Sequence, residues 1–344
     1  MIATLIAGCG APAGNAAAPA DGAAPQEAAA PADGAAPAAD KKLVIGLMPK
    51  LVGIEYFNAT EKGARKAAAE LGVELVYDGP QTADVTLQAQ MVDTWVTKQI
   101  DAIAIAPNDP DAIAVALKKA RKRGVKVLSW DADCQKDSRD FFVNQCTAES
   151  VAHTLVDVMA RNAGENAKYL ILTGTLTAAN QNLWIDFMER YTREKYPNMV
   201  NLSETPKASE EDQALATQVT TDSLKAYPGL QGIYAITSVA LPGAAEALRK
   251  ANAQDRVFLT GLTVPSVMRE HVSQGIVKEF VLWNPEDLGY LCIHAAVAAV
   301  KGELQPGDGT FKAGRLGEVT IKGDEVILGD PLIFTKDNIG QYNF

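Results

Sequence analysis

Short apolar runs alternate with amphipathic stretches along most of this chain, beginning at residue 43. The first run, 43–48, is rich in aliphatic residues and stops at Pro49, which is typical of a strand buried on both faces of a sheet. The stretch after it has apolar residues three and four positions apart, which indicates a helix that covers the sheet. Strand–helix units of about 30 residues then repeat, and this rhythm predicts parallel sheets flanked by helices.

The predicted strands fall at 43–48, 73–77, 102–106, 126–130, 141–145, 169–172, 200–203, 232–236, 257–262 and 277–283. The predicted helices fall at 55–71, 85–99, 111–123, 149–162, 181–196, 210–227, 241–251, 265–274 and 287–300. A loop rich in Gly and Pro at 302–317 and a hairpin-like pair at 318–321 and 325–328 complete the pattern.

The strand–helix units are too numerous for one doubly wound sheet. The fold class that we expect is therefore α/β with two lobes, and the chain should pass from the first lobe to the second near Thr147. The first lobe is expected to contain 42–147 and about 276–303. The second is expected to contain 148–275 and about 304–344. Late strands that return to the first lobe would make the chain cross between the lobes several times, as a hinge requires.

The first 41 residues differ from the rest, because Ala, Pro and Gly dominate them. Small residues follow a short apolar run and precede Cys9, as in the lipobox of bacterial lipoproteins; a chance Gly-Cys pair in a tail is the alternative. Residues 10–41 repeat Ala-Pro units that cannot bury a core, and they predict a disordered Ala/Pro-rich tether. We expect 1–9 to be the remnant of a lipoprotein signal and Cys9 to be lipidated.

Charge and cysteine usage exclude several classes of protein. The formal net charge is -10 and no long basic block occurs, so nucleic acid is not expected as a partner. No CxxC pair or Cys/His cluster occurs, so we expect no metal. Cys134 and Cys146 flank a predicted strand and could form a disulfide in an exported protein or stay free, whereas Cys292 fits a buried thiol.

Polar and aromatic side chains gather just beyond the predicted strands, where open parallel sheets bind ligands. Carboxylates and amides pair with sugar hydroxyls, and aromatic faces cover the C–H face of a sugar, so the mixture indicates a carbohydrate site. Taken singly, some members could have a purely structural role: Asp109 could cap a helix, Trp130 could be a core residue, and Asp131 could form an ion pair with Lys50. The candidate ligand-binding residues are Lys50, Tyr56, Phe57, Asp109, Trp130, Asp131, Asn180, Gln181, Ser238, Trp283 and Asn284.

Enzyme motifs are missing from the sequence. It contains no G-x-S-x-G elbow, no Walker A sequence and no G-x-G-x-x-G after the first strand. Asp131 and Asp133 stand two apart on an extended segment, so they point to one side and are poorly placed to flank a scissile glycosidic bond. We therefore expect no catalytic residue and no organic cofactor, with a carbohydrate-processing enzyme as the lesser alternative.

Several strings of the sequence are distinctive: Met48-Pro-Lys-Leu-Val-Gly53, Tyr77-Asp-Gly-Pro80, Leu128-Ser-Trp-Asp131, Asn180-Gln-Asn-Leu-Trp184, Trp283-Asn-Pro-Glu-Asp-Leu-Gly289 and Asp337-Asn-Ile-Gly340. They resemble the periplasmic sugar-binding proteins of ABC importers, in the branch that holds the rhamnose-binding and autoinducer-2-binding proteins. The resemblance covers Lys42 to Phe344, and it implies the type I periplasmic binding protein fold: two Rossmann-like parallel-sheet lobes joined by a three-crossing hinge.

The resemblance extends to single residues that correspond to ligand-site residues of these families. Lys50 matches the lysine that contacts the ligand in autoinducer-2 receptors, Asp131 matches one of their aspartates, and Gln181 matches their glutamine. Asp109 stands at the place of a sugar-contacting aspartate in the ribose-binding relatives.

Other positions depart from the autoinducer-2 receptors. Asn180 stands where they have an aspartate, and Ile236 and Ser238 stand where they have a proline and an alanine. The strings at 180–184 and 283–287 look more like the rhamnose-binding proteins. The departures therefore favour a sugar over autoinducer-2.

The resemblance implies a solute-binding lipoprotein of an ABC importer. We expect it to bind a small monosaccharide, a rhamnose-type 6-deoxy sugar or a pentose, between its lobes and to deliver it to the permease subunits. An autoinducer-2 receptor for uptake or signalling is the alternative. We expect an extracytoplasmic monomer that only its lipid anchors to the outer face of the cell membrane; a periplasmic location is the alternative. A repressor of this fold would carry an N-terminal helix-turn-helix, and a lipobox-like run and tether stand there instead.

Overall fold

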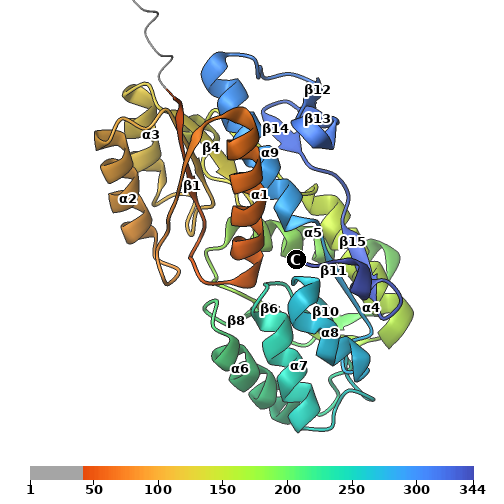
Figure 1. The fold of residues 1–344 in the computed structure, drawn as a ribbon. Coiled ribbons are helices and arrows are strands. Elements are labelled where there is room, and N and C mark those ends of the chain that lie inside the picture. The colour runs from red at the N-terminus through yellow and green to blue at the C-terminus, as the bar shows by residue number, and fades with distance from the viewer. Residues whose placement is uncertain (1–41) are drawn as a thin grey trace, which may run out of the picture. The chain divides into compact units, whose positions relative to one another are not determined.

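The computed structural model describes residues 42–344 (Figure 1). The predicted signal remnant 1–9, the lipidation at Cys9 and the tether 10–41 lie outside the described residues.

The first sheet contains eight strands in the described part of the chain, in the order β12-β13-β14-β5-β4-β3-β1-β2. Strands β1 to β5 pair in parallel, as their continuous apolar runs predict. Their bounds are β1 Val44–Met48, β2 Glu74–Tyr77, β3 Ala102–Ile105, β4 Lys126–Trp130, β5 Phe141–Asn144, β12 Gly309–Lys312, β13 Glu318–Lys322 and β14 Glu325–Ile327.

Helices cover both faces of this sheet. Alternate residues of β3 point to opposite faces: Ala102 and Ala104 pack in the core that includes α1 and α9, and Ile103 and Ile105 pack in the core that includes α2 and α3. The four helices are α1 Glu55–Leu71, α2 Val85–Thr97, α3 Ala114–Lys122 and α9 Pro285–Lys301.

The helices α1 and α9 touch backbone to backbone, because glycine stands at both crossing points. A Cβ on Gly63 would lie 1.8 Å from the carbonyl oxygen of Glu286, and a Cβ on Gly289 would lie 1.9 Å from that of Thr60. This close approach fixes α1, whose first turn carries the candidate residues Tyr56 and Phe57.

The second sheet has the strand order β10-β9-β6-β7, and β8 pairs with β6. Helix α4 packs against α5, and α6 packs against α7. The bounds are α4 Ala148–Ala163, β6 Lys168–Thr173, α5 Ala179–Lys195, β7 Val200–Asn201, β8 Lys207–Ala208, α6 Gln213–Ala226, β9 Gly232–Ala235, α7 Ala240–Lys250, β10 Phe258–Gly261 and α8 Pro265–Ser273.

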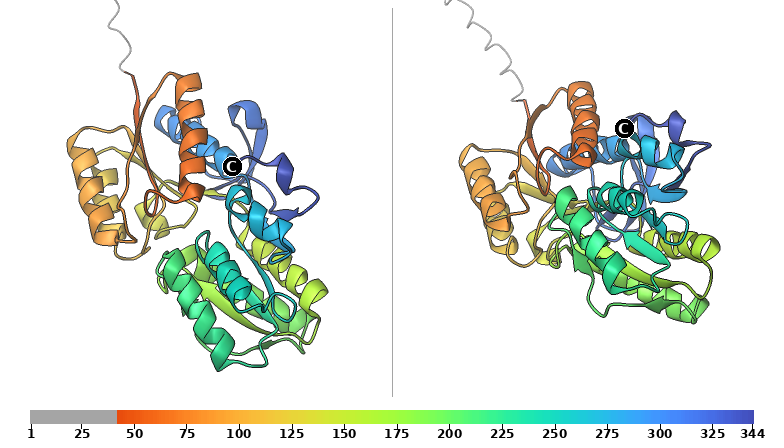
Figure 2. Two further views of the ribbon diagram at one scale, coloured as in Figure 1. Left: turned by 60° about the horizontal axis from the view of Figure 1, so that its bottom comes forward. Right: turned by 90° about the horizontal axis from the view of Figure 1, so that it is seen from below.

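The chain passes between the two sheets in three places within residues 42–344. The first passage joins β5 to α4, the second joins β11 (Glu279–Leu282) to α9, and the third joins β14 to β15 (Leu332–Thr335). Strands β11 and β15 form an antiparallel pair, and a bridge between Leu262 and Val281 attaches β11 to the second sheet. Figure 2 shows the two lobes and these connections from two further directions. The expected α/β fold with two parallel-sheet lobes and a three-crossing hinge is confirmed.

The C-terminal residues do not all lie in the lobe in which we expected them. We expected 304–344 in the second lobe, but β14 pairs in parallel with β5, so β12, β13 and β14 extend the first sheet. The buried Arg139 holds this extension, because its guanidinium pairs with Asp133 at 2.6 Å and with Asp324 at 3.0 Å. We also expected 276–303 in the first lobe, but only α9 lies there, because β11 joins the second sheet through its bridge to Leu262.

Cys134 and Cys146 are free thiols, so the disulfide alternative is not realised. Cys134 packs in the core beside α2 and α3, whereas Cys146 packs in the core on the other face of the sheet. Burial raises the pKa of the Cys134 thiol to about 11 and raises the pKa of Cys146 further, which keeps both protonated and unreactive at neutral pH.

Candidate functional site

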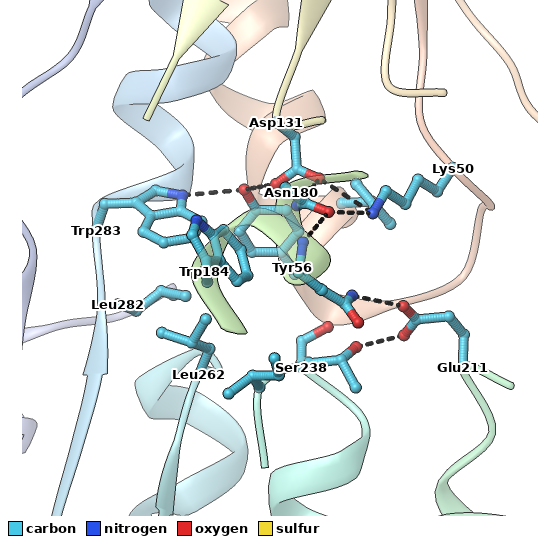
Figure 3. Close-up of a pocket in the computed structure, with 14 residues that line it drawn as sticks. Lys50, Tyr56, Asp131, Asn180, Trp184, Glu211, Ser238, Leu262, Leu282 and Trp283 are labelled. Carbon is cyan, nitrogen blue, oxygen red and sulfur yellow. Dashed lines mark hydrogen bonds and ion pairs between the residues drawn. The ribbon is translucent and has the colours of Figure 1, made fainter. Parts of the chain in front are cut away.

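A pocket lies between the carboxyl ends of the strands of the two sheets, and residues of both lobes line it (Figure 3). The lining combines charged and amide side chains with aromatic and aliphatic ones, which is the composition of a small-molecule site. The lining residues are Lys50, Tyr56, Phe57, Asp131, Asn180, Gln181, Trp184, Glu211, Ile236, Thr237, Ser238, Leu262, Leu282 and Trp283.

Asp131 follows β4 in a three-residue turn. Its φ is 61°, and the N–H of Ala132 donates to the carbonyl of Trp130 at 2.6 Å. A non-glycine residue rarely adopts this backbone, and such outliers collect at functional sites. The turn aims the carboxylate of Asp131 into the pocket, where the residue is 5% exposed.

The carboxylate of Asp131 is held by three neighbours. Tyr56 donates its hydroxyl to Oδ1 at 2.8 Å, Asn180 donates its amide to Oδ2 at 3.4 Å, and Lys50 Nζ lies 3.9 Å from Oδ2. Burial raises the pKa of Asp131, while the charge of Lys50 and the hydrogen bond from Tyr56 oppose that rise. Burial and the charge of Asp131 also raise the pKa of Tyr56, so its phenol stays a donor.

Lys50 stands just after β1 in a loop that buried amides hold. Asn108 donates its side-chain amide to the carbonyl of Lys50 at 2.8 Å. Gln88 in turn accepts from the N–H of Asn108 at 2.9 Å and donates to the carbonyl of Pro49 at 3.1 Å. This network fixes the loop that carries Lys50, which is 4% exposed.

Aromatic and aliphatic side chains form one wall of the pocket. The indole N–H of Trp283 donates to the hydroxyl of Tyr56 at 2.9 Å, and the two rings meet edge to face with centroids 6.1 Å apart. Trp184 lies against Trp283 with centroids 5.9 Å apart. Leu262 and Leu282 lie below the indoles in Figure 3, so an apolar wall stands beside the polar groups.

The second lobe supplies a further polar cluster. Gln181 accepts from the backbone N–H of Gly174 at 2.6 Å and donates its amide to Glu211 Oε1 at 3.2 Å. Thr237 donates its hydroxyl to Glu211 Oε2. A ligand in the pocket would therefore meet Asp131 from the first lobe and Glu211 from the second.

Eight of the candidate residues line this pocket together: Lys50, Tyr56, Phe57, Asp131, Asn180, Gln181, Ser238 and Trp283.

The other three candidates do not line it. Asp109 accepts from the N–H groups of Asp111 and Ala112, at 3.0 and 2.9 Å, in the turn before α3. Trp130 is fully buried and packs edge to face against Phe57 at 5.8 Å. Asn284 caps α9 by accepting from the N–H groups of Glu286 and Asp287. All three lie at or just after the ends of strands, but their side chains do not line this pocket.

Six lining residues were missing from the candidates: Trp184, Glu211, Ile236, Thr237, Leu262 and Leu282. Trp184 lies three positions after Gln181 on α5, so the same helix face could have indicated it. Thr237 and Leu262 follow strands as the chosen residues do. Nothing in the sequence indicated Glu211, because the two-residue strand β8 before it leaves no recognisable pattern.

The described residues contain no group of three or more His, Cys, Asp and Glu side chains that could hold a metal ion. Within 42–344, no helix combines the length and the apolar character that crossing a membrane requires.

A pocket between the strand ends of two lobes, with chain crossings beside it, defines a two-lobed solute-binding protein. A family model described as "Periplasmic binding protein domain" matches residues 45–304. The chain therefore belongs to the periplasmic binding protein family, and its fold is the type I fold of that family.

The solved structures that are similar to this chain include the following three, given with their sequence identity and coverage. A sugar ABC transporter protein from Actinomyces odontolyticus is 36% identical with a TM-score of 0.71, over 88% of this chain and 98% of that one. A solute-binding protein from Clostridium phytofermentas with bound L-rhamnose is 29% identical, with a TM-score of 0.84 and the same coverage. LsrB from Clostridium saccharobutylicum, in complex with AI-2, is 27% identical with a TM-score of 0.84, over 88% of this chain and all of that one.

Proposed function

We propose that this protein is the solute-binding lipoprotein of an ABC importer. It binds a small uncharged sugar, of the rhamnose type or a pentose, between its two lobes and delivers it to the permease. The observation that carries the proposal is the buried carboxylate of Asp131, held by Lys50 and Tyr56 beside an apolar wall.

The pocket offers a 6-deoxy sugar both kinds of contact that it needs. The carboxylate oxygens of Asp131 accept hydroxyl hydrogens, and Asn180 and Gln181 both donate and accept. The methyl group and the C–H face need an apolar surface, which Trp283, Trp184 and Leu262 supply. The similarity to a protein with bound L-rhamnose supports this choice.

Autoinducer-2 is the second candidate ligand. It is favoured by Lys50, Asp131 and Gln181, which all line the pocket, and by the similarity to LsrB in complex with AI-2. Asn180 and Ser238 line the same pocket and differ from the residues that those receptors carry, which ranks this ligand below a sugar.

Lipidation of Cys9, a location outside the cytoplasm, the permease partner and a monomeric state belong to the same proposal. They are supported by the lipobox-like run before Cys9 and by membership of the family.

Tryptophan fluorescence tests the proposal, because the indoles of Trp184 and Trp283 line the pocket. Titration with rhamnose or a pentose should change the emission and saturate, and the sugar should be recovered unchanged after incubation. Chemical conversion of the sugar would favour the enzyme alternative, and the absence of any saturable response would contradict sugar binding.

A further inference from the structure

Glu211 brings a second carboxylate to the pocket, from the connection between β8 and α6. Its oxygens accept from the hydroxyl of Thr237 and from the amide of Gln181. Lys50, the cation that lines the pocket, lies 3.9 Å from Asp131 and donates to Asn180. No ion pair found among residues 42–344 includes Glu211. The pocket therefore holds one cation against two carboxylates.

The backbone that carries Glu211 is unusual. Glu210 and Glu211 have φ values of 50° and 54°, so two consecutive non-glycine residues lie in the left-handed region. Hydrogen bonds hold them there: the N–H of Ser209 donates to the carbonyl of Thr173 at 2.9 Å, and the N–H of Glu210 donates to that of Gly174 at 2.8 Å. Strain that the surrounding structure maintains at a pocket indicates that the position of the side chain is used.

Gly174 makes room for the same carboxylate. A Cβ at Gly174 would lie 2.0 Å from Oε1 of Glu211. Since Gly174 has no positive φ, its backbone does not require glycine, and the close approach of Glu211 gives the physical reason for the residue. The strained turn thus carries the carboxylate to the pocket, and Gly174 leaves the space that it occupies.

We propose that Glu211 is a specificity-determining residue that restricts the pocket to uncharged polyhydroxylated ligands and excludes acidic ones. This inference rests on the proposed sugar-binding function. A neutral sugar donates hydroxyl hydrogens to Asp131 on one lobe and to Glu211 on the other. A sugar acid or sugar phosphate brings a further negative charge into a partly buried site whose lysine already faces Asp131, and like charges in such a site repel strongly.

Matched sugar pairs test this inference by calorimetric titration of the full-length protein. The pairs are L-rhamnose with L-mannuronate and D-fucose with D-galacturonate, which differ only in a methyl or a carboxylate at C6, and D-xylose with D-glucuronate. The wild-type protein should bind the neutral member of its preferred pair at least about 100-fold more tightly than the acid.

Two substitutions should lower this preference at least about ten-fold. Glu211→Gln removes the charge and keeps the shape. Gly174→Ala displaces the carboxylate through the new methyl group, with Glu211 still present. Glu210→Gln is the matched control, because this neighbouring glutamate shares the left-handed backbone but is exposed and outside the pocket. It should leave the preference unchanged, and thermal unfolding of each variant checks that it is folded.

The outcomes distinguish the proposed function from the role of Glu211. If no neutral sugar binds the wild-type protein, the proposed function fails and this inference fails with it. If a neutral sugar binds but Glu211→Gln leaves the ratio of neutral to acidic affinity unchanged, the inference fails and the proposed function stands. An equal effect of Glu210→Gln would also overturn it, because a general charge effect would then explain the preference.

Discussion

Lys50 donates a hydrogen bond of 2.9 Å from its Nζ to Oδ1 of Asn180, and this bond joins the end of β1 in the first lobe to the first turn of α5 in the second. Both residues are less than 10% exposed and both line the pocket. A ligand in the pocket would therefore lie beside a contact that joins the two lobes.

Replacing Asp131 should weaken binding, because its buried carboxylate lines the pocket and can accept hydrogen bonds from the ligand. A hydrogen bond to a charged group contributes about 1.5–3 kcal/mol, so Asp131→Ala should raise the dissociation constant by about one to two powers of ten in a calorimetric titration.

Asp109 provides the control for this substitution. It is an aspartate that also follows a strand, but it accepts from backbone N–H groups outside the pocket. Asp109→Ala should lower the free energy of unfolding by about 1 kcal/mol and leave the affinity unchanged. The reverse result, with Asp109 affecting affinity and Asp131 having no effect, would place the site elsewhere.

The rhythm of the fold could be predicted because β1, β3, β4 and β5 are buried inside the first sheet and keep continuous apolar runs. The strands β8, β12 and β15 could not be predicted, since they have only two to four residues, most of them partly or fully exposed, and so leave no periodic signal. Residues 305–328 belong to the first lobe because β14 pairs with β5. No local sequence pattern encodes such long-range pairing, so the sequence could not predict it.

The candidate site could also be predicted only in part. The position of a residue just beyond a strand places it near the pocket, but it does not give the direction of the side chain. Asn180 and Asn284 both begin helices after a strand; Asn180 reaches Lys50 across the pocket, whereas Asn284 turns back to cap its own helix. That difference is a matter of rotamer and of packing against the opposite lobe.

Binding should depend on pH through Asp131. Burial raises the pKa of this carboxyl above that of an ordinary aspartate, and the ionised form is the better acceptor of hydroxyl hydrogens. The affinity should therefore be full above the raised pKa and fall as the pH decreases through it, beginning at a higher pH than for an exposed aspartate. Calorimetric titrations at successive pH values measure this fall.

Stability should respond in the opposite direction. Since the folded state holds the proton of Asp131 more tightly than the unfolded state, the contribution of this group to the free energy of unfolding rises as the pH falls through the same range. Asp131→Asn removes both dependences, so the difference between the wild-type protein and this variant isolates them. An affinity that is constant across this range would show that Asp131 does not bind the ligand in its ionised form.

The contact between α1 and α9 predicts a large effect of one methyl group. Gly63→Ala would place a Cβ 1.8 Å from the backbone carbonyl of Glu286, so the helices must separate. We expect a loss of about 1–3 kcal/mol or more in the free energy of unfolding, measured by urea denaturation. Gly340→Ala is the control, because a Cβ there meets nothing within 4 Å. Equal stability of the two variants would mean that α1 and α9 do not approach this closely.

Membrane attachment should depend on Cys9 alone. Cells that express the wild-type protein should retain it in the membrane fraction, whereas Cys9→Ser should release it, since the lipid is the proposed anchor. Cys292→Ser, which changes a buried thiol of α9, is the control and should remain with the membrane. Retention of the Cys9→Ser protein would contradict lipidation at that residue.

We propose that the pocket between the lobes binds a small uncharged sugar. Calorimetric titrations of the full-length protein with L-rhamnose, pentoses and autoinducer-2 measure this binding. We predict saturable binding of one sugar per chain, with autoinducer-2 binding more weakly. Saturable binding of autoinducer-2 with no heat from any sugar would contradict it.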